Sequence, residues 1–287
     1  MLSKRTSWDL EPNPLAAALE ARRRRGAPIL DLMLSNPTQA GLAYPDGLWQ
    51  ALRRAEASAY RPEPLGRPSA RAAVRSYYGE KGTIVAAERV LLTASTSEAY
   101  AFLFKLLADP GDEVLVPRPS YPLFEFLAGL EGVAARTYPL RYRAGRWETD
   151  LDQLAAAITD RSRAIVVVSP NNPTGNSVRP EERAALEDLA AECGLALIAD
   201  EVFADYPLEA GPGEAASFAS GSRVLTFALS GLSKVLGLPQ LKLGWMVVDG
   251  PADAARDALA RLEVIADTYL SVATPVQEAL PELLSHR

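Results

Sequence analysis

The chain has 287 residues, of which 48% are hydrophobic, and its 30 basic and 36 acidic side chains give it a formal net charge of −6. A chain of this size can bury the core of one large domain, or of one large and one small domain. Because acidic side chains outnumber basic ones, the chain offers no positively charged surface of the kind that binds nucleic acid. The sequence also has no apolar run long enough to span a membrane and no apolar signal-peptide core, which favours a cytoplasmic protein without a membrane partner.

Six short β-rich runs alternate with helical patterns along the chain. The predicted strands are residues 89–93, 113–117, 164–169, 195–200, 223–228 and 243–248. Apolar residues recur at helical spacing in residues 97–109, 121–132, 150–158 and 180–194. This alternation predicts an α/β fold with a mostly parallel sheet flanked by helices, in which ligands bind beyond the carboxyl ends of the strands.

The rarest residues limit the chemistry that the chain can perform. The single histidine, His286, is the penultimate residue, so neither a Ser-His-Asp relay nor a histidine-rich zinc site can be built. A lysine with a lowered pKa is the natural substitute as base and nucleophile. The single cysteine, Cys193, cannot form an internal disulfide, and its setting predicts a packed residue at the end of a helix.

Polar residues follow the first three predicted strands. "ASTSEA" opens a helix after 89–93, where N–H groups and hydroxyls can hold a phosphate, although a plain N-cap uses the same residue types. Tyr121 stands between two prolines after residues 113–117, and its ring could either stack on a ligand or anchor the loop. "PNNPTG" follows 164–169, and its asparagines either donate amide hydrogen bonds into a site or form an ordinary turn.

The next two strands lead to ionisable groups. Asp200 closes the apolar strand 195–200, where a carboxylate needs a partner because an unpaired buried charge is costly. Lys234 follows 223–228 within "SGLSK". A phosphate cradle, an aromatic ring, an amide, a carboxylate and a lysine at five strand ends together predict a pocket for pyridoxal 5′-phosphate, in which the lysine forms the Schiff base.

Three segments, "PNNPTG", "DEVFADY" and "SGLSKVLGLPQLKLGW", resemble the class I/II aminotransferase family of fold-type I pyridoxal-phosphate enzymes in their order and separation. The resemblance runs from "LSNPT" at Leu34 to "SVATPVQEAL" at Ser271. It implies an N-terminal segment over residues 1–40, a cofactor-binding large domain over 41–250, and a connecting helix over 251–287. That helix would lead to the C-terminal part of a small domain. This part is absent from the sequence, so the small domain would be incomplete.

The resemblance assigns roles to residues at matching positions. Lys234 would form the Schiff base and later move the proton. Asp200 would pair with the pyridinium, Asn172 would hydrogen-bond the phenolic oxygen, and Tyr121 would stack on the ring. The phosphate would be held by Thr96, Ser97, Ser230 or Ser233, and Lys242.

Three further positions would extend the site. By the same resemblance, Tyr60 would reach a phosphate in the neighbouring subunit, which implies a homodimer with shared active sites. Ser35 and Asn36 match the N-terminal loop that lies over the substrate.

Three departures from the family pattern carry expectations of their own. Phe203 stands where many members have a tyrosine, which should raise the pKa of the imine unless Tyr206 compensates. Lys242 replaces a more common arginine, so phosphate binding should be weaker or less directional, unless this lysine is only a surface residue. The family's arginine for the substrate α-carboxylate lies in the C-terminal segment, so either the chain is truncated or another residue binds the carboxylate.

These observations predict a pyridoxal-phosphate-dependent aminotransferase that moves an amino group between an L-amino acid and a 2-oxo acid. A carbon–sulfur β-lyase or an amino-acid decarboxylase would use the same Lys234 and Asp200, and a non-catalytic cofactor-binding relative is a third interpretation. Release of pyruvate and ammonia without an acceptor would indicate the lyase. The sequence leaves the amino-acid substrate open.

Overall fold

The computed structural model describes residues 2–32, 34–53, 60–206, 216–270 and 272–287, which form two compact units, Met1–Tyr44 and Pro45–Arg287. The first unit contains the 3₁₀ helix η1 (Lys4–Thr6) and helix α1 (Pro14–Arg24). Asn13 caps α1 by accepting a hydrogen bond from the backbone N–H of Ala16 at 2.8 Å. No residue of α1 is buried, so local hydrogen bonds rather than a core define this helix.

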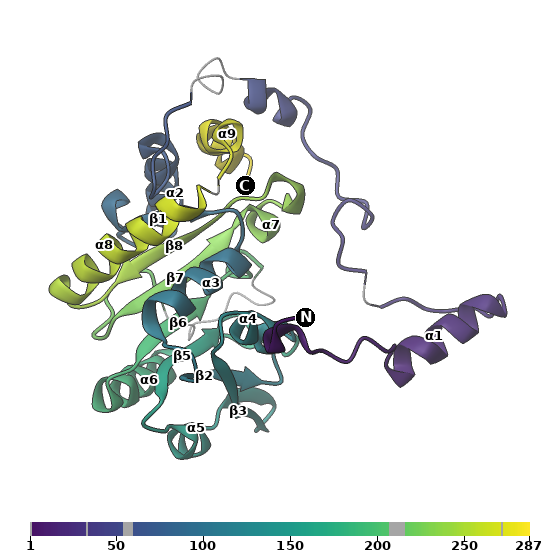
Figure 1. Cartoon of the computed structure of the whole chain (residues 1–287). Helices are drawn as coiled ribbons and strands as arrows, with labels where there is room; N and C mark the ends of the chain where they lie inside the picture. Colours follow the sequence, from purple (N-terminus) through teal and green to yellow (C-terminus); the bar gives the residue numbers. More distant parts are fainter. Residues whose placement is uncertain (1, 33, 54–59, 207–215, 271) are drawn as a thin grey trace. The chain divides into compact units, whose positions relative to one another are not determined.

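The second unit is built on a sheet that has eight strands within the described residues, in the order β1-β8-β7-β6-β5-β2-β3-β4 (Figure 1). Neighbouring strands from β7 to β3 run parallel, whereas β8 is antiparallel to β1 and β7, and β4 is antiparallel to β3. The strands are β1 (Val90–Thr93), β2 (Glu113–Arg118), β3 (Ala134–Arg143), β4 (Arg146–Thr149), β5 (Ser162–Val168), β6 (Ala196–Asp200), β7 (Thr226–Gly231) and β8 (Gly244–Asp249).

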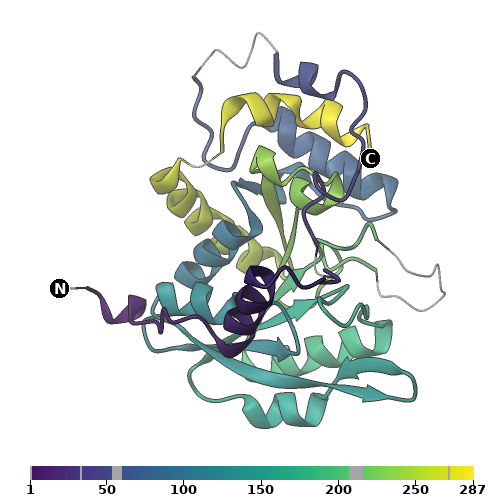
Figure 2. The same ribbon diagram turned by 90° about the vertical axis from the view of Figure 1, so that its right-hand side faces the viewer.

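Helices cover both faces of this sheet (Figures 1 and 2). On one face, α3 (Thr96–Leu107), α4 (Phe124–Leu130) and α8 (Ala252–Tyr269) bury alternate residues of the strands in one hydrophobic core. On the other face, Trp245 of β8 meets Tyr77 of α2 (Pro68–Glu80) with ring centroids 5.5 Å apart. The remaining helices in the described part of the unit are η2 (Leu48–Arg53), η4 (Ala87–Arg89), α5 (Leu151–Ala157), α6 (Pro180–Cys193), α7 (Leu232–Val235), η5 (Pro239–Leu241) and α9 (Thr274–Leu284).

The predicted strands and helices are confirmed, with ends shifted by no more than three residues. The sequence did not reveal β3 and β4, because "AARTYPLRYR" and "RWET" alternate exposed arginines with few apolar residues. This pattern is typical of strands at the solvated end of a sheet. A mostly parallel sheet flanked by helices is therefore the fold, as expected.

Two expectations about helices are wrong. The described residues of 251–287 form two helices, α8 and α9, rather than one connecting helix, and α8 ends at Tyr269 because the next residue, Leu270, adopts φ +52°. The second of them, α9, packs against α2 and η2 within the same unit. Cys193 does end α6, but it is exposed rather than packed.

Candidate active site

A cavity of about 250 Å³ lies at the edge of the sheet where the parallel strands end. Val168 and Asp200 are the last residues of β5 and β6, and both line it. The start of β8 lies at the same edge because β8 runs antiparallel to β7. The cavity brings together most of the predicted site residues, namely Thr96, Ser97, Tyr121, Asn172, Asp200, Ser233, Lys234 and Lys242.

The N-terminus of α3 forms one wall of the cavity. Ser95 is the N-cap, and its side chain accepts a hydrogen bond from the backbone N–H of Glu98 at 3.1 Å. The carboxylate of Glu98 in turn accepts from the backbone N–H of Ala94 at 2.7 Å. This reciprocal cap leaves the hydroxyls of Thr96 and Ser97 beside the cavity at the positive end of the helix dipole, which suits an anion such as phosphate.

Two facing glycines bring this helix end close to the sheet. Gly231 and Gly244 are paired in β7 and β8, and both line the cavity. A Cβ on Gly244 would lie 3.1 Å from the carbonyl carbon of Ser95 and 3.2 Å from the nitrogen of Thr96. A Cβ on Gly231 would lie 2.9 Å from the Cα of Gly244. A side chain on Gly244 would push the first turn of α3 away from the strand ends, and one on Gly231 would clash with the backbone at the start of β8. The missing Cβ atoms thus leave room for a close backbone approach of the kind that phosphate-binding loops commonly need.

Asp200 supplies a buried carboxylate to the opposite wall. Its Oδ2 accepts a hydrogen bond from the hydroxyl of Tyr100 at 3.0 Å, and its Oδ1 accepts from the backbone N–H of Val202 at 3.2 Å. Burial raises the pKa of Asp200 to about 6, against the opposing effects of these two donors and of the positive charge on Lys234. A cationic group in the cavity would complete the solvation of this carboxylate.

Lys234 lies in the short helix α7, directly after β7, and is half-buried. Its Nζ lies 5.4 Å from the ring centroid of Phe203, a cation–π distance. The hydroxyl of Tyr206 donates to the backbone oxygen of Lys234 at 2.5 Å. Tyr206 therefore anchors the backbone of the lysine, and it is not among the residues that line the cavity.

The loops after β2 and β5 are tied together by Asn171, the neighbour of the predicted Asn172. The buried Asn171 side chain donates to the backbone oxygen of Pro119 at 3.1 Å and accepts from the hydroxyl of Ser120 at 2.9 Å. These bonds hold Tyr121 and Asn172 at the same cavity. Burial and the charge of Asp200 raise the pKa of Tyr121, so its phenol stays neutral.

Ser230 does not join the predicted phosphate-binding residues. It faces a different cavity, which Tyr77, Tyr78 and Glu201 also line, because successive residues of β7 point to opposite faces. Its side chain is buried, and its Oγ has no hydrogen-bond partner within the described part of the chain. Of the two serines that the sequence offered, the structure brings Ser233 to the cavity at the strand ends.

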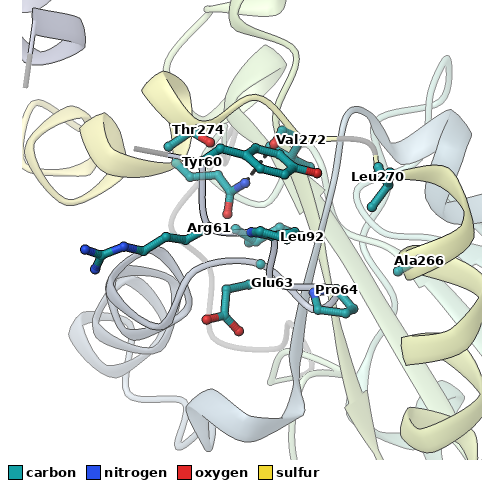
Figure 3. Close-up of a pocket in the computed structure, with 12 residues that line it drawn as sticks. Tyr60, Arg61, Glu63, Pro64, Leu92, Ala266, Leu270, Val272 and Thr274 are labelled. Atoms are coloured by element: carbon teal, nitrogen blue, oxygen red, sulfur yellow. Dashed lines mark hydrogen bonds between the residues drawn. The ribbon is translucent and has the colours of Figure 1, made fainter. Parts of the chain in front are cut away.

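Tyr60 lies outside this cavity. Its side chain is 76% exposed and lines a small cavity of about 60 Å³ with Leu92, Ala266 and Leu270 (Figure 3). Seven residues further along the chain, the backbone N–H of Arg67 donates to Oε1 of Gln277 at 2.7 Å. Contact of Tyr60 with a neighbouring subunit remains a prediction.

Ser35 and Asn36 belong to the N-terminal unit, and their role at the substrate also remains a prediction. Within that unit, Asn36 begins a turn, since its Oδ1 accepts hydrogen bonds from the backbone N–H and the hydroxyl of Thr38.

Several residues of the cavity were not predicted: Ser95, Val202, Gly231 and Gly244, together with Tyr100 behind Asp200. The glycines carried a signal, because both flank the lysine segment "GLSKVLGLPQLKLG", but they suited a turn and a strand equally well. Tyr100 carried none, since an aromatic residue inside an apolar helix usually indicates core packing.

The described residues contain no helix long and apolar enough to cross a membrane, and no cluster of three His, Cys, Asp or Glu side chains that could hold a metal ion. A half-buried lysine, a buried carboxylate and the N-terminus of α3 meet around one cavity of this α/β protein, and this set of groups makes the cavity a candidate site for a small anionic ligand.

The chain belongs to the class I and II aminotransferase family, whose family model matches residues 32–287. It is 32% identical over 261 residues to a glutamate-pyruvate aminotransferase of Haemophilus influenzae, with 90% of this chain and 64% of that protein covered. It is 34% identical over 273 residues to an alanine aminotransferase of Mycobacterium tuberculosis, with 92% of this chain and 61% of that protein covered. The chain thus spans less than two thirds of the length of these curated relatives.

Solved structures show the same fold. The alanine aminotransferase of Pyrococcus furiosus superimposes with a TM-score of 0.86 at 29% identity, covering 99% of this chain and 73% of that one. An aminotransferase of Escherichia coli superimposes with a TM-score of 0.83 at 30% identity, covering 98% and 70%. The fold is therefore that of the aminotransferases of this family.

Proposed function

We propose that this chain binds pyridoxal 5′-phosphate in the cavity at the strand ends and acts, as part of an aminotransferase, on an L-amino acid and a 2-oxo acid. The observation that supports this most directly is the meeting of Lys234, Asp200 and the N-terminus of α3 at one cavity of about 250 Å³. The family and its named relatives support the same reaction class.

The phosphate would lie at the N-terminus of α3, against Gly231 and Gly244. Hydroxyls of Thr96, Ser97 and Ser233 would donate to it, and Lys242 would contribute positive charge. Lys242 lines the cavity but is exposed to solvent. We expect it to strengthen phosphate binding without fixing the orientation of the phosphate.

The aromatic ring would lie between Tyr121 and the strand ends. Asp200 would hold the ring nitrogen in its protonated form, and the amide of Asn172 would donate to the ring oxygen. When bound, the cofactor supplies an electron sink for bonds at the α-carbon of the amino acid. Lys234 would hold the cofactor through its Nζ and later move the proton at that α-carbon.

The assembly is also part of the proposal. We infer a homodimer in which Tyr60 of one subunit reaches the phosphate of the other, which is compatible with the 76% exposure of the Tyr60 side chain. We place the protein in the cytoplasm. We further propose that residues 41–250 form the cofactor-binding domain, with Ser35 and Asn36 closing over the substrate.

The first experiment is the visible absorption spectrum during addition of pyridoxal 5′-phosphate, followed by borohydride reduction and peptide mapping. A new visible band and a label on Lys234 are expected, and Lys234→Ala should lose both. Lys105→Ala, which changes a lysine in the last turn of α3, serves as the control. Label scattered over surface lysines would contradict the proposed site.

The reaction class is tested next with a panel of amino acids and 2-oxo acids. Transfer of the amino group to the 2-oxo acid is expected. Release of pyruvate and ammonia without an acceptor would indicate a lyase, and release of carbon dioxide would indicate a decarboxylase. A bound cofactor whose spectrum does not respond to any amino acid would instead indicate a non-catalytic relative.

A further inference from the structure

Tyr100 is a buried tyrosine to which the proposed reaction assigns no role. It lies in α3, one turn after the N-terminal residues that line the cavity, and its side chain is 1% exposed. The ring is fixed by Phe124 and Phe104, with centroid distances of 5.3 Å and 5.8 Å. Its hydroxyl therefore has one well-defined position, 3.0 Å from Oδ2 of Asp200.

Within the described residues, two protein groups donate to Asp200, one to each carboxylate oxygen. Tyr100 donates to Oδ2 and the backbone N–H of Val202 donates to Oδ1. With one donor on each oxygen, the carboxylate cannot rotate without breaking a bond. Its remaining lone pairs are available to a group in the cavity that Asp200 lines.

The ionisable groups around Asp200 come from three elements besides its own strand. Tyr100 lies on α3, Tyr121 on the loop after β2, and Lys234 on α7. Burial favours the neutral acid, whereas the Tyr100 hydroxyl and the positive charge of Lys234 favour the carboxylate. Burial is the larger effect, and it raises the pKa of Asp200 to about 6. Burial and the charge of Asp200 also raise the pKa of Tyr100 well above its usual value, so its hydroxyl keeps the proton that it donates.

We propose that Tyr100 is a positioning residue that keeps the carboxylate of Asp200 ionised and turned toward the ring nitrogen of the cofactor. This inference rests on the proposed function, because it concerns the same carboxylate. A backbone amide such as that of Val202 can supply one donor at this strand end, and Tyr100 supplies the second from a neighbouring helix. Without it, one oxygen of a buried carboxylate would lose its protein donor.

The test compares Tyr100→Phe with Tyr138→Phe. Tyr138 is a matched control, because it is also 1% exposed and its hydroxyl donates to a backbone oxygen, that of Val166, at 2.8 Å. The first readout is the titration of the Asp200 carboxyl in cofactor-free protein, followed by carbon NMR of labelled aspartate and assigned with Asp200→Asn. A hydrogen bond to a charged group changes the equilibrium by about tenfold or more, so the midpoint should rise by about one pH unit or more in Tyr100→Phe only.

The second readout is the affinity for pyridoxal 5′-phosphate relative to an analogue that has carbon in place of the ring nitrogen. The ratio of the two affinities should fall about tenfold in Tyr100→Phe and stay unchanged in Tyr138→Phe. A purely structural role would weaken both ligands equally and leave the ratio as in the wild type. An unchanged ratio together with an unchanged carboxyl titration would overturn the inference.

A second variant separates this effect from loss of stability. Tyr100→Leu removes the ring as well as the hydroxyl and should be less stable than Tyr100→Phe, yet both should shift the carboxyl titration equally. Different shifts that follow stability would also overturn the inference. If the wild type binds neither ligand, the proposed function fails, whereas the carboxyl titration still tests the contact between Tyr100 and Asp200.

Discussion

Substituting Gly244 by alanine tests the proposed phosphate site most directly. The added Cβ would lie 3.1 Å from the carbonyl carbon of Ser95 and 3.2 Å from the nitrogen of Thr96, and 3.3 Å from the backbone oxygen of Ser230. These neighbours are backbone atoms, so they cannot move aside as a flexible side chain would. The first turn of α3 must therefore recede from the strand ends by a few tenths of an ångström.

That displacement acts on the donors that would hold the phosphate. A hydrogen bond to a charged group contributes about 1.5–3 kcal/mol. Loss of about half of one such bond, ~1.4 kcal/mol, would weaken binding about tenfold. Pyridoxal lacks the phosphate, so its affinity should not depend on these donors. Gly244→Ala should therefore lower the affinity for pyridoxal 5′-phosphate and leave the affinity for pyridoxal near the wild-type value.

The assay is an absorbance titration of each variant with both ligands, with urea unfolding to measure stability. Gly129→Ala is the matched control, because Gly129 lies inside α4 and a Cβ added there would have no neighbouring atom within 4 Å. Alanine at this position should stabilise the helix by up to about 1 kcal/mol. Equal losses of affinity for the two ligands in Gly244→Ala would refute the argument, because they would indicate general damage to the cavity rather than displacement of phosphate donors.

Three further predictions concern ionisable and aromatic groups of the same cavity. Lys242→Ala should weaken binding of pyridoxal 5′-phosphate by a few-fold to about tenfold, measured by absorbance titration, and an unchanged affinity would make Lys242 a surface residue. Phe203→Tyr should lower the pH midpoint of the visible absorbance of bound cofactor, since a phenol can donate to the ring oxygen, and a midpoint that stays in place would show that residue 203 does not reach it. Burial raises the pKa of Asp200 from 3.8 to about 6, so the folded chain binds more protons than the unfolded chain between these values, and stability falls as pH rises through that range. Asp200→Asn should therefore be more stable than the wild type above about pH 6, by at most about 3 kcal/mol, and should lose this advantage near pH 4; urea unfolding that finds the same difference at both pH values would contradict the assignment.

Local sequence patterns were enough to identify the residues that stand at the ends of strands. An apolar run of β-branched residues predicts a strand, and the polar residue that follows must lie at the edge of the sheet. This reasoning identified Asp200, Asn172 and Lys234. The local apolar pattern predicts where each strand ends, and a parallel arrangement brings the carboxyl ends of the strands to one edge of the sheet. The order of these residues also carried the resemblance to the family.

Strand register and helix packing, in contrast, determine which face of a strand each residue occupies and which distant elements touch. Ser230 and Ser233 were equivalent in the sequence, but the register of β7 turns Ser230 away from the cavity. The contact of Gly244 with the first turn of α3 and the bond from Tyr100 to Asp200 join residues about 150 and 100 positions apart in the chain. Such contacts follow from the tertiary structure, which no local pattern encodes, and they set the geometry that the chemistry of this site requires.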